Sequence, residues 1–157
     1  MDLKGVVQTD LKLTGKSHST ILMWREDLHA VQLDLDSLLS IAGPNRSGLW
    51  NAMRKFMRHK NTLMYVLTSE TWYVEGNKPR DQYPAYFADS PERKEMVVIQ
   101  AETTTRAENE CYRILRDRSG KPRLGPQFTD VRWRGGDMTY LLSPKPEGPG
   151  LRARDGA

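Results

Sequence analysis

The sequence of 157 residues lacks most features by which membrane and secreted proteins are recognised. Its single cysteine, Cys111, cannot form an internal disulfide, so we expect a reducing compartment. No run of about 18 apolar residues is present, and we therefore expect no membrane span. The first residues lack the basic start and apolar run of a signal peptide. Together these absences predict a cytoplasmic protein, with the virion as an alternative location.

The usual motifs of cofactor and metal sites are also missing. The three histidines, His18, His29 and His59, are far apart, and no His or Cys pair has the spacing of a metal site. The run Thr14-Gly-Lys-Ser17 matches the end of a phosphate-binding loop, but the position that requires glycine holds Asp10. An acidic residue there repels phosphate, so this run does not predict nucleotide binding.

One carboxylate pattern fits a magnesium-dependent nuclease. Asp89, Glu92 and Lys94 follow the loose order of two acids and a lysine, and Glu70 or Asp81 could replace the first acid. The two acids are only three residues apart, whereas such ligands normally project from neighbouring strands. We therefore predict no cofactor, no metal site and no enzymatic activity.

Positive charge is concentrated in the last third of the chain. Residues 1–112 contain 14 Lys and Arg against 15 Asp and Glu, whereas residues 113–157 contain 10 against 5. The net charge of +4 thus arises entirely after residue 112. This asymmetry indicates either a polyanionic partner or an acidic protein surface, and a solubilising basic tail explains it equally well.

Two helices are predicted in the first 60 residues. Between residues 19 and 42, apolar residues recur at spacings of three and four, which is typical of one helical face. These residues are Ile21, Trp24, Leu28, Val31, Leu35, Leu38 and Ala42. Gly43 and Pro44 end this helix, and a second is predicted over 46–59. We expect the two to form a helical hairpin over residues 19–60.

The rest of the chain is predicted to form strands. Their expected ranges are 62–75, 94–103, 109–117, 121–128 and 137–142, and a weak alternation also indicates a short strand within 4–13. Local connections favour antiparallel pairing. The sequence therefore predicts an α+β fold, with the N-terminal helical hairpin packed on a four- to five-stranded antiparallel sheet over 62–142. We expect residues 1–142 to form one domain and residues 143–157 a disordered tail.

Three motifs lie between residues 59 and 124. They are Ser69-Glu-Thr-Trp72, then Pro91-Glu-Arg-Lys-Glu95 with the apolar run Met96-Val-Val-Ile99, then Ile114-Leu-Arg116 through Gly120-Lys-Pro-Arg-Leu124. This region resembles a group of uncharacterised proteins that are common in phages and prophage-bearing bacteria. The resemblance covers under half of the chain. It implies a phage or prophage origin and supplies no activity.

A long loop over residues 76–93 connects two of these motifs and is the candidate binding site. Loops of this length are commonly functional, and aromatic and Arg side chains dominate interface energetics. The candidate partner-binding residues are Glu70, Trp72, Tyr83, Tyr86, Phe87, Arg93 and Glu95. We interpret Glu70 chiefly as an anchor of the strand ends, where Arg93 or Lys94 comes within reach of Glu70 or Glu75.

The sequence thus predicts an accessory protein that binds a macromolecular partner. Inhibition of a host or defence complex is the sharper form of this hypothesis. One alternative is a virion-associated or oligomeric role, with the stripe at 21–42 pairing between chains. The other is nucleic-acid binding, with a magnesium-dependent nuclease as its less favoured form. The candidate nucleic-acid-binding residues are Arg54, Lys55, Arg58, Arg116, Lys121, Arg123, Arg132, Trp133 and Arg134.

Overall fold

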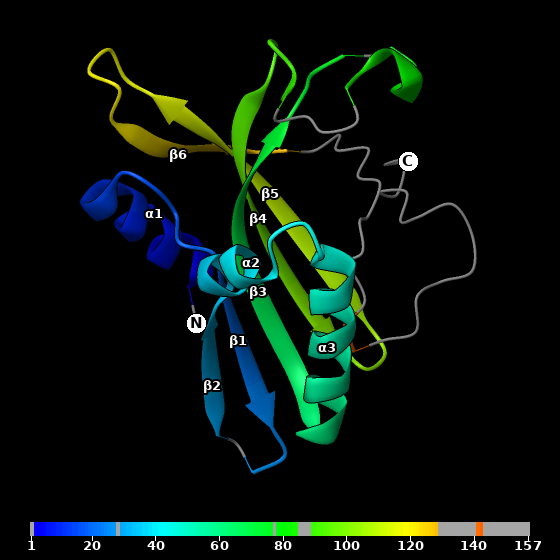
Figure 1. The fold of residues 1–157 in the computed structure, drawn as a ribbon. Coiled ribbons are helices and arrows are strands. Elements are labelled where there is room, and N and C mark those ends of the chain that lie inside the picture. The colour runs from blue at the N-terminus through cyan, green and yellow to red at the C-terminus, as the bar shows by residue number, and fades with distance from the viewer. Residues whose placement is uncertain (1, 28, 77, 85–88, 129–140, 143–157) are drawn as a thin grey trace.

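A six-stranded antiparallel sheet with helices on both faces is the framework of the protein (Figure 1). The computed structural model describes residues 2–27, 29–76, 78–84, 89–128 and 141–142. The elements in chain order are α1 (Leu3–Thr14), β1 (Thr20–Arg25), β2 (Ala30–Asp34), α2 (Leu35–Ala42), α3 (Arg46–His59), β3 (Thr62–Tyr73), the 3-10 turn η1 (Arg80–Gln82), β4 (Lys94–Thr103), β5 (Ala107–Arg116) and β6 (Pro122–Gln127). Within these ranges no helix has the length and apolar character needed to cross a membrane.

The central strand β3 is longer than the strand that covers one of its edges. The order across the sheet is β2-β1-β3-β4-β5-β6, and every neighbouring pair is antiparallel. On one side, β4 pairs with β3 from Met64 as far as Tyr73. On the other side, β1 pairs with β3 only between Thr62 and Thr68. Residues 69–73 of β3 therefore extend beyond the end of β1.

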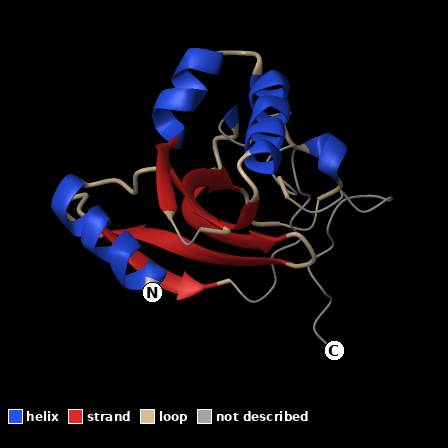
Figure 2. Ribbon diagram, turned by 90° about the horizontal axis from the view of Figure 1, so that it is seen from below, coloured by secondary structure: helices blue, strands red, loops and turns tan. Residues whose placement is uncertain are grey.

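One face of the sheet is covered by α2 and α3, which form a helical hairpin (Figure 2). Asp34 caps α2 by accepting a hydrogen bond from the Ser37 N–H at 3.2 Å, and Asn45 caps α3 in the same way. Residues from β1, β3 and the hairpin form the core of this layer. They are Ile21, Met23, Leu35, Trp50, Met53, Met57, Tyr65 and Leu67.

The opposite face is covered by α1, the first helix of the chain (Figure 2). Val7 and Leu11 are four residues apart, so they lie on one side of α1 and are buried against β3, β4 and β5. The Gln8 side-chain oxygen also accepts a hydrogen bond from the Leu124 N–H of β6 at 3.0 Å. The first element of the chain is therefore joined to the last strand of the sheet.

A buried polar network lies on the α2–α3 face of the sheet. The Glu102 side chain is 1% exposed, and its carboxylate accepts hydrogen bonds from the Tyr65 hydroxyl and from the N–H groups of Leu141 and Leu142 at 3.0 and 3.1 Å. The Gln100 amide donates to the Tyr65 oxygen at 2.6 Å. Burial, with the Glu102 charge as the second cause, strongly raises the pKa of Tyr65. The network thus holds residues 141–142 against β3 and β4.

The α+β class predicted from the sequence is confirmed, and the sheet has six strands rather than four or five. The helix over 46–59 and the strand over 94–103 have the predicted bounds. The strands predicted over 62–75, 109–117 and 121–128 differ from the observed ones by one to two residues at their ends. Residues 137–140 of the last predicted strand and the predicted tail over 143–157 lie outside the described residues.

The helix predicted over 19–42 is wrong in its first half. Residues 20–34 form the hairpin of β1 and β2, and only Leu35–Ala42 is helical, so the helical hairpin spans 35–59. Ile21 packs under α2 and α3, whereas Trp24 contacts the core under α1. In a helix both side chains would share one stripe, but in a strand positions separated by an odd number lie on opposite faces.

The short strand predicted within 4–13 is also wrong, because this segment is α1. The apparent alternation used Val6 and Leu13, which are both exposed. The buried residues Val7 and Leu11 have helical spacing, Asp2 caps the first turn, and Gly15 ends the helix with a φ of 81°.

Candidate functional site

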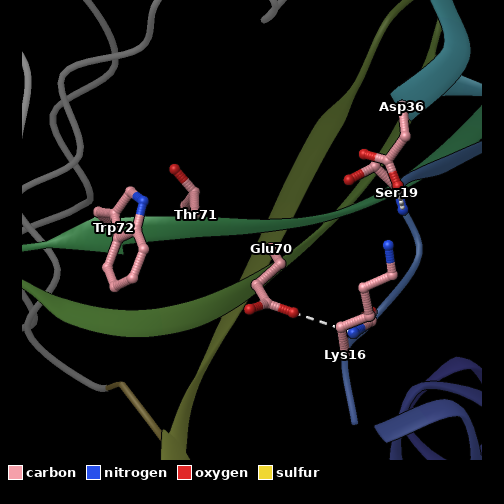
Figure 3. A pocket seen from close by; sticks show the side chains of 7 residues that line it. Lys16, Ser19, Asp36, Glu70, Thr71 and Trp72 are labelled. Atoms are coloured by element: carbon pink, nitrogen blue, oxygen red, sulfur yellow. Dashed lines mark hydrogen bonds between the residues drawn. The ribbon is translucent and has the colours of Figure 1, made fainter. Parts of the chain in front are cut away.

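The candidate site lies where β3 and β4 extend beyond β1. Trp72 is 38% exposed there and contributes to the walls of two shallow hollows of about 220 and 380 Å³. The smaller hollow lies beside residues 69–73 of β3 (Figure 3). The residues that line it are Lys16, Ser17, Ser19, Asp36, Glu70, Thr71 and Trp72. A large exposed indole at the end of a rigid sheet is a suitable contact for another molecule.

Two carboxylates hold the connection between α1 and β1 at the edge of the smaller hollow. Glu70 accepts a hydrogen bond from the Ser17 N–H at 2.9 Å, and Asp36 accepts one from the Ser19 N–H at 3.1 Å. Glu70 was predicted to anchor the strand ends, and the segment that it holds in the structure is instead the α1–β1 connection. This contact also satisfies main-chain donors that would otherwise lack a partner at the start of β1.

The predicted ion pair at the strand ends forms between Lys94 and Glu75. Their side chains are 2.6 Å apart, and Arg113 of β5 contacts the same carboxylate at 2.9 Å. The pKa of Glu75 is lowered, chiefly by the hydrogen bond from Lys94 and next by the positive charge of Arg113. Tyr73 also donates to Glu75 at 3.3 Å. This cluster connects the ends of β3, β4 and β5 on one face of the sheet.

On the other face, cations and acids surround Trp72. The Arg93 guanidinium lies 5.0 Å from the centre of the indole ring, which is within the range of a cation–π contact. Glu95 is the register partner of Trp72 and accepts two hydrogen bonds of 2.6 Å from Arg116 of β5. We call Trp72, Arg93, Glu95 and Arg116 the strand-end surface. Because Glu95 binds Arg116 through both oxygens, the position of each side chain is well defined.

The long loop contributes Tyr83, whose placement depends on Gly76. A side-chain carbon added at Gly76 would lie 2.5 Å from the Tyr83 hydroxyl oxygen, and the φ of 150° at Gly76 also favours glycine. Lys78 lies 5.9 Å from the centre of the Tyr83 ring. Of the loop's candidate binding residues, the structure therefore places Tyr83, while Tyr86 and Phe87 lie outside the described residues.

The candidate nucleic-acid-binding residues do not gather on one surface of the described chain. Arg54, Lys55 and Arg58 belong to α3, which packs on the face opposite α1. Arg116 is held by Glu95 on the α1 face. Lys121 and Arg123 are exposed at the β5–β6 hairpin, and residues 132–134 lie outside the described ranges. The structure thus separates the described basic residues into two groups, one on α3 and one at the β5–β6 hairpin.

The His, Cys, Asp and Glu side chains of the described residues do not form a metal centre. No group of three His, Cys, Asp or Glu side chains in those ranges is placed to hold a metal ion. The Nδ1 atom of His18 lies 3.0 Å from both carboxylate oxygens of Asp10. Asp10 is therefore paired with His18, the residue that follows the phosphate-loop-like run at 14–17. Cys111 is buried in β5, and its burial raises the pKa of the thiol to about 11. A thiol with this pKa is a poor nucleophile at neutral pH.

We predict that Cys111 reacts with iodoacetamide at pH 8 on the order of 100 times more slowly in the folded protein than in urea. An unperturbed thiol has a pKa of about 8.5, so its thiolate fraction at pH 8 is far larger. Mass spectrometry over time measures both rates. Between pH 8 and 10 the rate in the folded protein should rise about tenfold per pH unit, while the rate in urea levels off. Equal rates under both conditions would contradict the buried thiol.

Sequence reasoning missed the residues on the β1 side of the site. Ser17 contacts Glu70, and Lys16 and Asp36 line the same hollow, because β1 pairs with β3 in the register that places Thr20 opposite Thr68. No local spacing connects positions 16 and 70. The pairing of distant strands was the missing information.

Comparison with protein-family models, curated proteins and solved structures found no match to this chain.

Proposed function

We propose that this protein acts by binding another protein through the strand-end surface, as an accessory protein of phage or prophage origin. The observation that carries the proposal is the exposed Trp72 with the Arg93 guanidinium 5.0 Å from its ring. Trp and Arg are the residues most enriched among the side chains that dominate binding energies. In its more specific form, the proposal is that the partner is a host or defence complex, which the protein inhibits.

The surroundings of Trp72 support binding rather than chemistry. The ion pair of Glu95 and Arg116 provides a polar rim beside the indole, as is common around the centre of an interface. The cluster around Glu75 fixes the strand ends from the other face. Because both sets of contacts hold the strands, the indole is presented on a rigid element, and little conformational entropy is lost on binding.

Trp72→Ala is expected to weaken partner binding at least tenfold, equivalent to about 1.4 kcal/mol. The immobilised protein is incubated with nuclease-treated host lysate, so that capture through nucleic acid is removed, and captured proteins are quantified by mass spectrometry. A partner identified in this way is then titrated by calorimetry. The expected result is a protein that the wild type captures and the Trp72→Ala variant loses.

Leu63→Ala is the matched control, because Leu63 is 47% exposed at the opposite end of β3. It removes a similarly exposed apolar side chain from the same strand and should leave capture unchanged. If both variants capture the same proteins as the wild type, the strand-end surface does not bind the partner. If proteins are captured from untreated lysate and none from nuclease-treated lysate, the basic residues bind nucleic acid and the proposal fails.

A further inference from the structure

We propose that the larger hollow at the strand ends binds an acidic segment of the partner protein, whose Asp or Glu side chains are bound by Arg113 and Lys94. This inference rests on the proposed function, because it states the chemistry of the partner that meets the same end of the sheet. The hollow has a volume of about 380 Å³, and Trp72 contributes to its wall.

The hollow lies where the sheet divides into two hairpins. β4 pairs with β3 as far as Lys94, and β5 pairs with β6 as far as Arg116. β4 and β5, however, pair with each other only as far as Met96 and Arg113. Beyond this pair the β5–β6 hairpin turns away from the ends of β3 and β4 (Figure 1). Side chains from the ends of all three strands β3, β4 and β5 therefore line the hollow.

Positive charge predominates among the residues that line the hollow. The cations are Arg93, Lys94, Arg113 and Arg116, and the anions are Glu75 and Glu95. Four positive charges against two negative ones leave a net charge of +2. An occupant with one or two carboxylates balances this charge, whereas an apolar or cationic occupant leaves it uncompensated.

Lys94 and Arg113 lie on the face of the sheet away from Glu70, the acid nearby that lines the smaller hollow. Lys94 is the register partner of Tyr73, which is an odd number of residues after Glu70 in β3 and so lies on the opposite face. Arg113 pairs with Met96, two residues after Lys94 in β4, and shares the face of Lys94. Repulsion from Glu70 therefore falls on the other side of the sheet.

Arg113 is the cation whose surroundings best suit a bound carboxylate. Its guanidinium lies 5.0 Å from the centre of the Phe128 ring, so a cation–π contact helps to hold the flat group in place. One terminal nitrogen is 2.9 Å from Glu75. A guanidinium carries five N–H donors, and a single carboxylate does not use all of them. Because 42% of the side chain is exposed, a carboxylate of the partner has access to Arg113.

The two acids in the hollow favour a peptide over nucleic acid as its occupant. Glu75 and Glu95 lie among the cations and repel a closely spaced run of phosphates, which binds best to a continuous basic surface. A peptide presents single carboxylates and apolar side chains together, and Trp72 and Ile114 give the hollow apolar lining. We therefore expect an occupant in which Asp or Glu adjoins an apolar or aromatic residue.

The test uses a random nonapeptide library displayed on phage and panned against the full-length protein. Enriched sequences are synthesised with a fluorescent label, and their affinity is measured by anisotropy. We expect these sequences to be rich in Asp or Glu beside aromatic or apolar residues. Their affinity should fall at least fivefold between about 50 and 300 mM NaCl, because salt screens the charges at an exposed hollow.

Removal of one cation measures its part in binding. Arg113→Gln should weaken the peptides about tenfold, and Arg113→Lys should weaken them less, because it keeps the charge and loses the forked donors. Arg58→Gln is the matched control, since Arg58 is exposed on α3, which ends next to the opposite end of β3. It should leave the affinity unchanged.

Removal of an anion reverses the sign of the expected effect. Glu75→Gln raises the net charge of the hollow and should tighten the acidic peptides about threefold. If Glu75 served only to hold the strand ends, its loss would weaken binding, so the direction of the change separates the two roles. Glu108→Gln, at an exposed position near the other end of β5, should have no effect.

Several outcomes would overturn the inference. Enriched peptides that lack Asp and Glu, or acidic peptides that bind the Arg113→Gln variant as tightly as the wild type, remove the hollow as an acidic-peptide site. The proposed function still stands in that case if Trp72→Ala loses the partner captured from lysate. Acidic peptides that require Arg113 and bind the Trp72→Ala variant equally well support the hollow and contradict the role proposed for Trp72.

The same samples test nucleic acid as the occupant. A thymidine oligonucleotide of about 20 bases is titrated against the wild type and the Arg113→Gln variant. If no peptide is enriched above a panning without protein, the inference fails. Oligonucleotide binding that depends on Arg113 would then assign the hollow to nucleic acid.

Discussion

Replacing Glu102 by alanine is expected to lower the free energy of unfolding by about 3 kcal/mol. The substitution leaves the Tyr65 hydroxyl and the main-chain N–H groups of Leu141 and Leu142 buried without their acceptor. Each such group costs roughly 1–3 kcal/mol, and part of this loss is offset because a carboxylate no longer has to be buried. Urea unfolding followed by tryptophan fluorescence measures the change.

Glu108→Ala is the control for this experiment, because Glu108 is an exposed carboxylate on the adjacent strand β5. It should change the unfolding free energy by less than about 0.5 kcal/mol. Tyr65→Phe removes one donor of the network and should cost about 1–2 kcal/mol. If Glu102→Ala is no more destabilising than Glu108→Ala, the network does not hold residues 141–142 to the sheet.

Leu67→Ala is expected to destabilise the protein by about 3–4 kcal/mol. The Leu67 side chain is fully buried between the central strand and the α2–α3 hairpin, so its removal leaves a cavity that a well-packed core cannot fill. The midpoint of urea unfolding should shift accordingly, with the slope unchanged.

The same substitution at Leu63 provides the comparison. Leu63 lies four residues earlier in β3 and is 47% exposed, so Leu63→Ala should cost about 1 kcal/mol or less. The residue type, the strand and the change are identical, and the difference between the two variants therefore reports burial alone. Equal losses at both positions would show that the α2–α3 hairpin does not cover Leu67 in solution.

The sequence carried enough information to predict α3 and β4, because their signals are local. The apolar side of α3 is preceded by Gly43, Pro44 and Asn45, which end one helix and begin another. The run Met96-Val-Val-Ile99 is buried on both faces and is too short for a helix. The region over 20–34 was predicted wrongly because its apolar residues fit a helical period as well as a strand period, and the pairing of β1 with β3 decides between them.

The sequence predicted the part of the candidate site at the ends of β3 and β4 and missed the part beside β1. Glu70, Trp72 and Glu95 lie on the two strands whose ends the sequence placed together, Arg93 directly precedes the second strand, and the structure brings all four to one end of the sheet. The partner of Glu70 on the α1–β1 connection was not predictable, because 53 residues separate Ser17 from Glu70. Contacts of this kind depend on sheet register, and a single sequence contains no direct signal for register between strands that are distant along the chain.

The position of α1 has a consequence for how the chain folds as it is synthesised. α1 leaves the ribosome before every strand of the sheet, yet it packs against β3, β4 and β5 and contacts Leu124 of β6, 116 residues after Gln8. At about 5–20 residues per second, its docking surface is completed roughly 6–20 s after α1 itself. A helix of 12 residues is marginal on its own in water, so α1 should stay largely unfolded during this interval. Until β6 has been synthesised and paired, the apolar face formed by Val66, Val97 and Ile99 remains uncovered, and nascent chains are then most prone to aggregate.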